Sequence, residues 1–112
     1  MILYSKGDIV LVPFPFTNQS GTKKRPALVI SPDAYNSTLD ILIGFITSNV
    51  NVANRIGDCH IRDWQISGLP KPSMFRMKLA TLEHTNVIKK LGTISTYDMK
   101  QIEQTIVNFI IA

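Results

Sequence analysis

The stretch Gly7–Ser31, GDIVLVPFPFTNQSGTKKRPALVIS, decides the fold that we expect for this chain. Ile9 to Val12 is an apolar and largely β-branched run, typical of a buried strand, and Ala27 to Ile30 is a second such run. Pro13 and Pro15 cannot donate ladder hydrogen bonds, so the first strand must end there or lie at a sheet edge. The two runs therefore predict a hairpin.

The segment between these runs combines turn chemistry with positive charge. Thr17 to Thr22 is rich in turn-forming residues, and Gly21 can take a positive φ. Lys23, Lys24 and Arg25 follow directly and stand before Pro26. A cationic corner at the mouth of a hairpin is suited to holding a phosphate group.

The rest of the chain continues the β pattern and ends in a helix. Leu39–Thr47 is the most apolar run and predicts a central strand, with Gly44 at a bulge or a close approach. We expect a helical turn at 34–38, loops at 48–55 and 67–73, and short strands at 57–64, 74–79 and 86–91. Ser95 and Asp98 suit a helix N-terminus, and an apolar repeat at helical spacing follows: Met99, Ile102, Ile106, Phe109 and Ile110. The predicted fold class is mainly β with one C-terminal helix, a small barrel or strongly curved sheet.

Length and composition narrow the class of protein. The 112 residues, 45% hydrophobic and 18% charged, predict a single globular domain spanning 1–112. No apolar run approaches the roughly 20 residues that span a bilayer, and the opening MILYSKGD predicts no signal peptide. One cysteine, Cys59, excludes an internal disulfide and fits the cytoplasm. Metal-ligand spacing is missing, so we expect no metal and no cofactor.

The net charge of +4 belongs to the body of the domain. Residues 1–95 carry eleven Lys and Arg against six Asp and Glu, whereas residues 96–112 carry one Lys against two acidic residues. A basic body favours an anionic partner.

Several motifs together resemble one family. GDIVLVPFPFT and KKRPALVIS are similar to the beginning of the MazF/PemK toxins of type II toxin–antitoxin systems, and the likeness continues through Ile46-Thr47-Ser48 and MFRMKLATLEHTNVIKKLGTIS. The resemblance implies an SH3-like barrel, usually a homodimer. It also implies a metal-independent endoribonuclease that cleaves single-stranded RNA, leaves 2′,3′-cyclic phosphate and 5′-hydroxyl ends, and is covered by a cognate antitoxin protein.

Arg25 and Thr47 are the candidate catalytic residues. When a 2′-hydroxyl attacks the adjacent phosphorus, the phosphoryl group gains negative charge, and the planar fork of an arginine can stabilise it with two charge-assisted hydrogen bonds. Arg25 matches the catalytic arginine of the family that the chain resembles. Thr47 matches the family's catalytic threonine, and its hydroxyl could donate to a phosphate oxygen held by Arg25.

The candidate RNA-binding residues are polar, cationic or aromatic and surround these two. Lysines contact the RNA backbone electrostatically, and an aromatic ring can stack on an unpaired base. The candidates are Phe16, Thr17, Ser20, Lys23, Lys24, Ser48, Asn49, Arg76 and Lys78. Arg76 and Lys78 alternate with Met77, so both are expected to point into one groove.

The general base and acid stay unassigned. Several family members have an acidic residue where this chain has Ser20 or its neighbours, and a carboxylate or glutamine where it has Met77-Lys78. His60 and His84 can titrate near neutrality, but we give neither a role. Two other classes remain open: a CcdB-like toxin that blocks a topoisomerase, and a non-catalytic RNA-binding barrel. The ending NFIIA lacks the tryptophan-containing tail of the CcdB kind.

Overall fold

The computed structural model describes residues 2–14, 23–51 and 55–112. Within them the chain forms one antiparallel sheet of six strands and a long C-terminal helix. The strands are β1 (Asp8–Phe14), β2 (Lys23–Val29), β3 (Asp40–Thr47), β4 (Cys59–Ile61), β5 (Ser73–Glu83) and β6 (Lys89–Thr93). The helices are α1 (Asp33–Asn36), the 3₁₀ turn η1 (His84–Asn86) and α2 (Thr96–Ile111).

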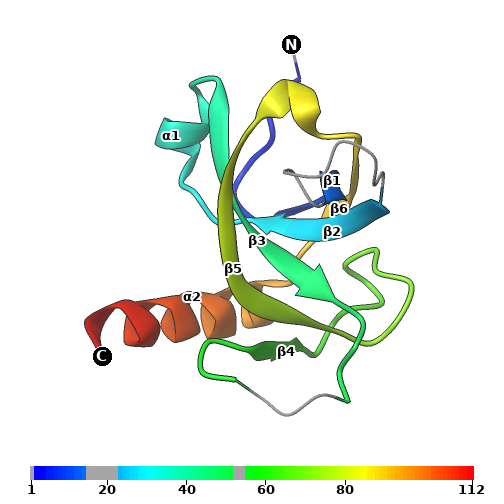
Figure 1. Ribbon diagram of the computed structural model, residues 1–112, viewed down its shortest axis with the longest axis vertical. Helices are drawn as coiled ribbons and strands as arrows, with labels where there is room; N and C mark the ends of the chain where they lie inside the picture. Colours follow the sequence, from blue (N-terminus) through cyan, green and yellow to red (C-terminus); the bar gives the residue numbers. More distant parts are fainter. Residues whose placement is uncertain (1, 15–22, 52–54) are drawn as a thin grey trace.

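The strand order is β4-β5-β3-β2-β1-β6, and the sheet curls strongly, with α2 lying beside β4 at one end (Figure 1). The expected mainly β, barrel-like fold with one C-terminal helix is therefore confirmed. The central strand predicted from Leu39–Thr47 is β3, third in the sheet. Among the described residues no helix is both long enough and apolar enough to cross a membrane.

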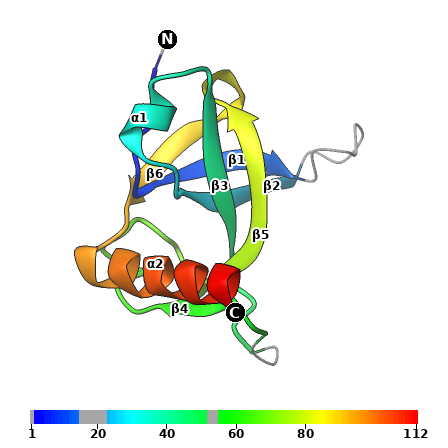
Figure 2. The same ribbon diagram turned by 90° about the vertical axis from the view of Figure 1, so that its left-hand side faces the viewer.

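The first hairpin extends further than the sequence suggested. β1 and β2 pair through Phe14 opposite Lys23, whereas β6 pairs with β1 at Asp8–Leu11. Pro13 thus lies beyond the β6 pairing, at the edge position expected of it, and β1 and β2 project together from the body (Figure 2). Lys23, Lys24 and Arg25 were placed in a corner before the strand; this was wrong, because their backbone continues the ladder with β1.

Three other predicted boundaries also need correction. The strand expected at 74–79 is part of β5, and the strand expected at 86–91 begins at Lys89 because η1 precedes it. The strand expected at 57–64 is limited to Cys59–Ile61. It ends there because the backbone N–H groups of Arg62 and Asp63 donate to Asp98, at 2.9 and 2.8 Å, and leave the ladder.

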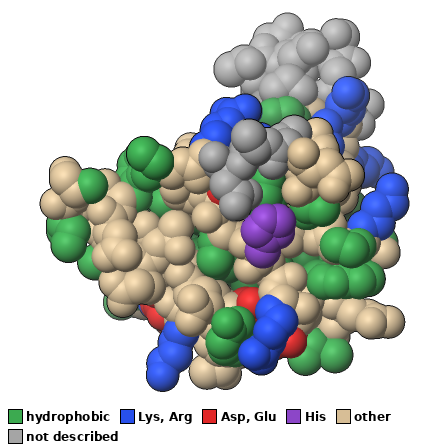
Figure 3. Space-filling model, turned by 90° about the horizontal axis from the view of Figure 1, so that it is seen from below, with side chains coloured by type: hydrophobic (Ala, Val, Ile, Leu, Met, Phe, Trp, Pro, Cys, Tyr) green, Lys and Arg blue, Asp and Glu red, His purple; other side chains and the backbone are tan. Residues whose placement is uncertain are grey.

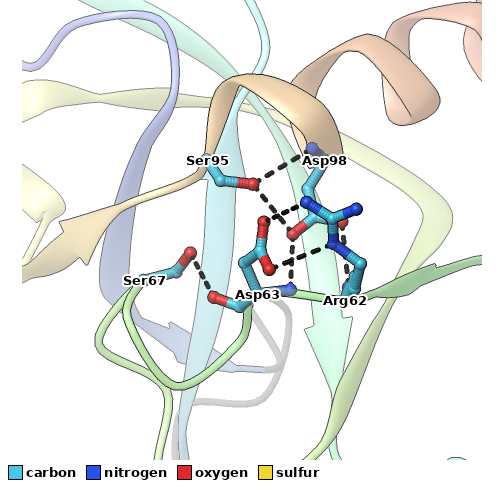
Figure 4. A network of polar contacts seen from close by, with 5 residues as sticks. All are labelled: Arg62, Asp63, Ser67, Ser95 and Asp98. Atoms are coloured by element: carbon cyan, nitrogen blue, oxygen red, sulfur yellow. Dashed lines mark hydrogen bonds and ion pairs between the residues drawn. The ribbon is translucent and has the colours of Figure 1, made fainter.

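The N-terminus of α2 is fixed by that carboxylate (Figure 4). Ser95 caps the helix as predicted, since its Oγ accepts the N–H of Asp98 at 3.1 Å. The Asp98 side chain is buried and accepts hydrogen bonds from Ser95 Oγ and from the two backbone N–H groups of the 62–63 turn. One buried carboxylate thus joins α2 to the end of β4.

The two faces of the curled sheet bury separate apolar clusters because side chains alternate along each strand. In β1, Val10 and Val12 lie in one cluster and Ile9 lies in the other. The second cluster is covered by α2 through Met99, Ile102 and Ile106. Trp64 packs against this helix-side cluster. The first cluster ends at Phe14 and Phe45, on the face that carries the site described below.

Gly44 lies at a close approach between β3 and β5, as the sequence predicted. A Cβ at Gly44 would stand 2.2 Å from Cε1 of Phe75, which is fully buried. The β3–β5 register shifts here: Gly44 pairs with Leu79 and Ile46 with Phe75, so Arg76–Lys78 of β5 stand opposite the single residue Phe45. This is a β-bulge in β5.

We predict that Gly44→Ala lowers the free energy of unfolding by about 1–3 kcal/mol, because the buried ring of Phe75 has no room to move away. Urea titration followed by circular dichroism measures the change. In a Phe75→Leu background the cost of Gly44→Ala should shrink, since the clashing ring edge is gone. An equal cost in both backgrounds would contradict the close approach.

Candidate active site

A groove opens on the face of the first cluster, at the bulge between β3 and β5. Its walls come from four strands, and its volume is about 150 Å³. It is lined by Phe14, Arg25, Phe45, Ile46, Thr47, Arg76 and Lys78. Phe14 and Lys78, which are 64 positions apart in the sequence, therefore meet in one place.

Strand periodicity explains why these side chains share the groove. In β2, Arg25 has the same parity as Ala27 and Val29, which lie in the first cluster. In β5, Arg76 and Lys78 have the parity of Ala80 and Leu82, which also contact that cluster. Arg76 and Lys78 were expected to point into one groove, and the structure confirms it.

Arg25 lies on an aromatic support. Its guanidinium carbon is 5.7 Å from the centroid of the Phe14 ring, and Phe14 meets Phe45 edge-on at 4.9 Å. A cation against a ring face is attracted by the ring quadrupole and keeps its N–H groups for other partners. No carboxylate in the described parts of the chain forms an ion pair with Arg25. Among these residues, no acidic side chain occupies its fork of donors.

Thr47 ends β3 at the groove. Its Oγ1 accepts the backbone N–H of Asn49 at 3.1 Å, and this contact orients the hydroxyl. Because a hydroxyl both accepts and donates, the hydrogen of Thr47 is still available to donate to an anion. Ser48 and Asn49 follow at the exposed start of the next loop.

Arg76 is held by a carboxylate behind the groove wall. Its Nε and Nη2 donate to Oδ1 and Oδ2 of Asp58 at 3.4 and 3.2 Å. The Asp58 side chain is 3% exposed and that of Arg76 16% exposed. Burial by itself would raise the pKa of Asp58, but the hydrogen bonds from Arg76 and from the Arg55 N–H together hold this pKa below its usual value. The Asp58 carboxylate therefore stays ionised at neutral pH.

The groove as a whole is cationic. Arg25, Arg76 and Lys78 supply three positive charges, and none of the described residues that line it is acidic. Neutral lining comes from two phenylalanine rings, one isoleucine and the Thr47 hydroxyl. Such a donor set matches a phosphodiester, which offers negatively charged acceptor oxygens next to apolar ribose and base surfaces.

Other predicted residues lie around the groove or outside the described chain. Lys23 and Lys24 are exposed at the start of β2, and alternation puts Lys23 on the face of Arg25 and Lys24 on the opposite face. Phe16, Thr17 and Ser20 lie outside the described residues.

The two histidines have different surroundings. His84 is buried: its Nδ1 accepts the backbone N–H of Tyr4 at 3.1 Å, and its Nε2 lies 2.8 Å from the carbonyl oxygen of Asn36. Both ring nitrogens are thus used in packing the chain. His60 is exposed on β4 and is not part of the groove lining. In the described part of the chain, no three His, Cys, Asp or Glu side chains cluster in a way that could hold a metal ion.

Four residues of the site were not predicted from the sequence: Phe14, Phe45, Ile46 and Asp58. The first three line the groove, whereas Phe16 was the aromatic residue expected there. The alternation of Val10, Val12 and Phe14 opposite Arg25 was a usable signal, once the hairpin register was known. Asp58 gave no signal, because nothing in a sequence links it to a partner 18 residues away.

Comparison with solved structures shows the fold. An endoribonuclease from a mycobacterial species, solved with its cognate antitoxin, has a TM-score of 0.77 at 15% identity, over 96% of this chain and 94% of that one. MazF from Deinococcus radiodurans has a TM-score of 0.76 at 17% identity over the full length of both chains. The toxin MazF-mt6 from Mycobacterium tuberculosis has a TM-score of 0.72 at 16% identity, over 90% of this chain and 93% of that one.

Comparison with curated protein sequences gave no match. A family model, however, matches residues 5–110, nearly the whole chain, and so includes every residue of the groove. The chain belongs to the family of PemK-like, MazF-like toxins of type II toxin–antitoxin systems.

Proposed function

We propose that this toxin is a metal-independent endoribonuclease that cleaves single-stranded RNA in the groove around Arg25. The observation that carries the proposal is the convergence of Arg25, Arg76 and the Thr47 hydroxyl from three strands on one small cationic groove. Family membership supports it, as does the shared fold with endoribonucleases such as the mycobacterial enzyme.

Each residue has a distinct task in this mechanism. The 2′-hydroxyl of the RNA loses its proton and attacks the adjacent phosphorus. The bond to the 5′-oxygen breaks and this oxygen takes up a proton, so that a 2′,3′-cyclic phosphate and a 5′-hydroxyl end result. Arg25 donates two hydrogen bonds to the phosphoryl oxygens, which strengthen as these oxygens gain charge in the transition state. Thr47 donates its hydroxyl hydrogen to the same phosphate and fixes its orientation.

Binding is assigned to the rim of the groove. Lys23 and Lys78 contact the RNA backbone, and Ser48 and Asn49 lie where ribose or base edges would pass. Phe16, Thr17, Ser20 and Lys24 stay in the proposed binding set: Lys24 for its charge, and Phe16 because an aromatic ring can stack on a base. We expect a cognate antitoxin protein to cover this groove; the mycobacterial relative was solved in complex with its own antitoxin. We place the toxin in the cytoplasm, where the single thiol of Cys59 stays reduced.

One experiment distinguishes the ribonuclease from the two other candidate functions. Purified protein is incubated with a long RNA transcript in excess EDTA. Cleavage supports the metal-independent ribonuclease, and retention of intact RNA indicates a non-catalytic RNA-binding barrel. Failure both to bind and to cleave favours a toxin that acts through protein contacts, as the CcdB kind does on a topoisomerase.

We predict that Arg25→Ala lowers the cleavage rate by at least about 100-fold, equivalent to roughly 2.7 kcal/mol of transition-state stabilisation. Arg25→Lys should restore little, because a single ammonium cannot reproduce the fork. Initial rates on a defined transcript measure both variants. A folded Arg25→Ala protein that keeps more than half of the wild-type rate would refute the assignment.

The two lysines of β2 should act on binding and not on the chemical step. Replacing both with alanine should raise KM and flatten the dependence of log affinity on log salt by about 0.7 per lost phosphate contact. The rate at saturating RNA should stay within a few-fold of wild type. Because Lys23 shares the face of Arg25, Lys23→Ala should account for more of the change than its matched control, Lys24→Ala. If the double variant binds RNA with an unchanged salt slope but does not cut it, the lysines act on the chemical step and their assignment to binding is wrong.

We predict a homodimer. The last turns of α2 are apolar yet exposed: Ile110 is 71% and Ile111 75% exposed. Figure 3 shows hydrophobic side chains at the left, where α2 ends, and again at the right, with Lys and Arg side chains at the top, the upper right and the lower edge. Beside Val107 an apolar cavity of about 590 Å³ lies between α2 and the sheet. A second copy related by a two-fold axis would cover both the helix end and the cavity.

Light scattering at micromolar concentration should therefore give about twice the chain mass of 12.5 kDa. Ile110→Glu should shift the mass toward the monomer, because a carboxylate on each copy would enter an apolar interface. Glu at the exposed polar position Gln104 is the matched control and should leave the mass unchanged. A wild-type monomer that still cuts RNA would contradict the dimer.

A further inference from the structure

One buried carboxylate touches the groove wall without lining the groove. Asp58 lies behind Arg76 and contacts it through both carboxylate oxygens, at 3.4 Å to Nε and 3.2 Å to Nη2. This geometry uses one edge of the guanidinium. Nη1 carries two further N–H donors that the pair does not use. Arg76 lines the groove at the same time.

The turn that carries Asp58 is itself fixed on β5. Asp58 Oδ2 accepts the backbone N–H of Arg55 at 2.9 Å, and the Asp58 N–H donates to the Arg55 carbonyl oxygen at 3.0 Å. Gly57 has a φ of +96° and leaves no room for a side chain, since a Cβ there would stand 2.7 Å from Cβ of Met77. The carboxylate is thus held at a fixed place relative to β5 and to Arg76.

A long arginine side chain in an open groove would otherwise sample many rotamers. The position of Arg76 is particularly in need of support, because it lies in the bulge of β5 that stands opposite Phe45. Asp58 supplies this support from the side that faces away from the groove. Asp58 also partly neutralises the charge of Arg76, so it does not by itself raise the affinity for RNA. Its contribution to the groove is to fix the position of the Arg76 guanidinium.

We infer that Asp58 is a positioning residue of the ribonuclease site, which holds the guanidinium of Arg76 so that its unused N–H groups meet the scissile phosphate together with Arg25. This inference rests on the proposed function. Arg76 is then the second phosphate-binding fork of the groove. Asp58 acts on RNA only through Arg76.

The inference predicts that Asp58→Asn slows the chemical step much more than it weakens RNA binding. Asp58→Asn keeps an oxygen that can accept the Arg55 N–H, and so keeps the turn, but it loses the ion pair with Arg76. The saturating single-turnover rate on a long transcript should fall about ten-fold or more, because a misplaced fork no longer fits the transition state. The half-saturating protein concentration should change less than about three-fold, or even fall, because removal of a negative charge favours RNA binding.

A matched control is present in the chain. Asp63 forms the same two-bond fork with Arg62, at 3.1 and 3.1 Å (Figure 4). Arg62, however, lies over the Tyr97 ring at the start of α2 and does not line the groove. Asp63→Asn should leave both the saturating rate and the half-saturating concentration at wild-type values. Circular dichroism and thermal melts establish that each variant is folded.

A double-mutant cycle separates positioning from general destabilisation. Arg76→Gln should lower the saturating rate, and adding Asp58→Asn to it should cause no further loss, because Asp58 has no arginine left to hold. The double variant leaves neither an unpaired carboxylate nor an unpaired guanidinium, so its rate can be compared with that of Arg76→Gln even if Asp58→Asn alone does not fold.

Two results would overturn the inference. One is a folded Asp58→Asn protein with a wild-type saturating rate; the other is an equal loss from Asp58→Asn in the presence and absence of Arg76. If wild-type protein does not cut the transcript at all, the proposed function fails and the inference fails with it. If the wild type cuts the transcript and Asp58→Asn has no effect, the inference about Asp58 is rejected but the proposed function stands.

Discussion

The pairing of β1 with β2, in the register that sets Val12 opposite Arg25, places the central arginine of the site. Side chains alternate along a strand, so a slip of one residue would turn Arg25 to the opposite face and bring an exposed lysine into its place. The register is fixed by burial: Val10, Val12, Ala27 and Val29 must all enter the same apolar cluster. The hydrophobic effect on one half of the hairpin thus determines where the charge lies on the other half.

The bulge in β5 places the side chains that form the second half of the groove. Gly44 allows β3 and Phe75 to approach closely, and three residues of β5 then stand opposite Phe45. Arg76 and Lys78 reach the groove from this irregular segment, and Thr47 reaches it from the end of β3. A regular ladder would pair these residues one to one and leave less open space. The tight packing of a glycine in the core and the open groove beside it are therefore parts of one arrangement.

The sequence predicted the fold class, the central strand, the cap of α2 and the partnership of Arg76 with Lys78, because these depend on local patterns of period 2 or 3.6. It did not predict the short β4, because Asp98 removes the donors of Arg62 and Asp63 from the ladder through a contact 35 residues away. It also placed Lys23–Arg25 before the strand, since charged residues at a hairpin end resemble a loop. Phe14 and Asp58 were missed for the same reason: their roles depend on which strands lie side by side.

The central claim is that this groove promotes attack of the RNA's own 2′-hydroxyl, and the chemistry of the product ends tests it most directly. Products formed in EDTA are divided into two portions. After Mg²⁺ is restored, one portion is treated with labelled ATP and a polynucleotide kinase that lacks 3′-phosphatase activity, with no prior phosphatase step. The 3′ ends of the other portion, which no kinase has touched, are analysed by mass spectrometry. The account predicts immediate labelling of 5′-hydroxyl ends and a 3′ mass that matches a 2′,3′-cyclic phosphate. A transcript with 2′-O-methyl groups throughout should stay intact. Ends with a 5′-phosphate, or cleavage of the methylated transcript, would contradict the account, because water and not the 2′-hydroxyl would then be the nucleophile.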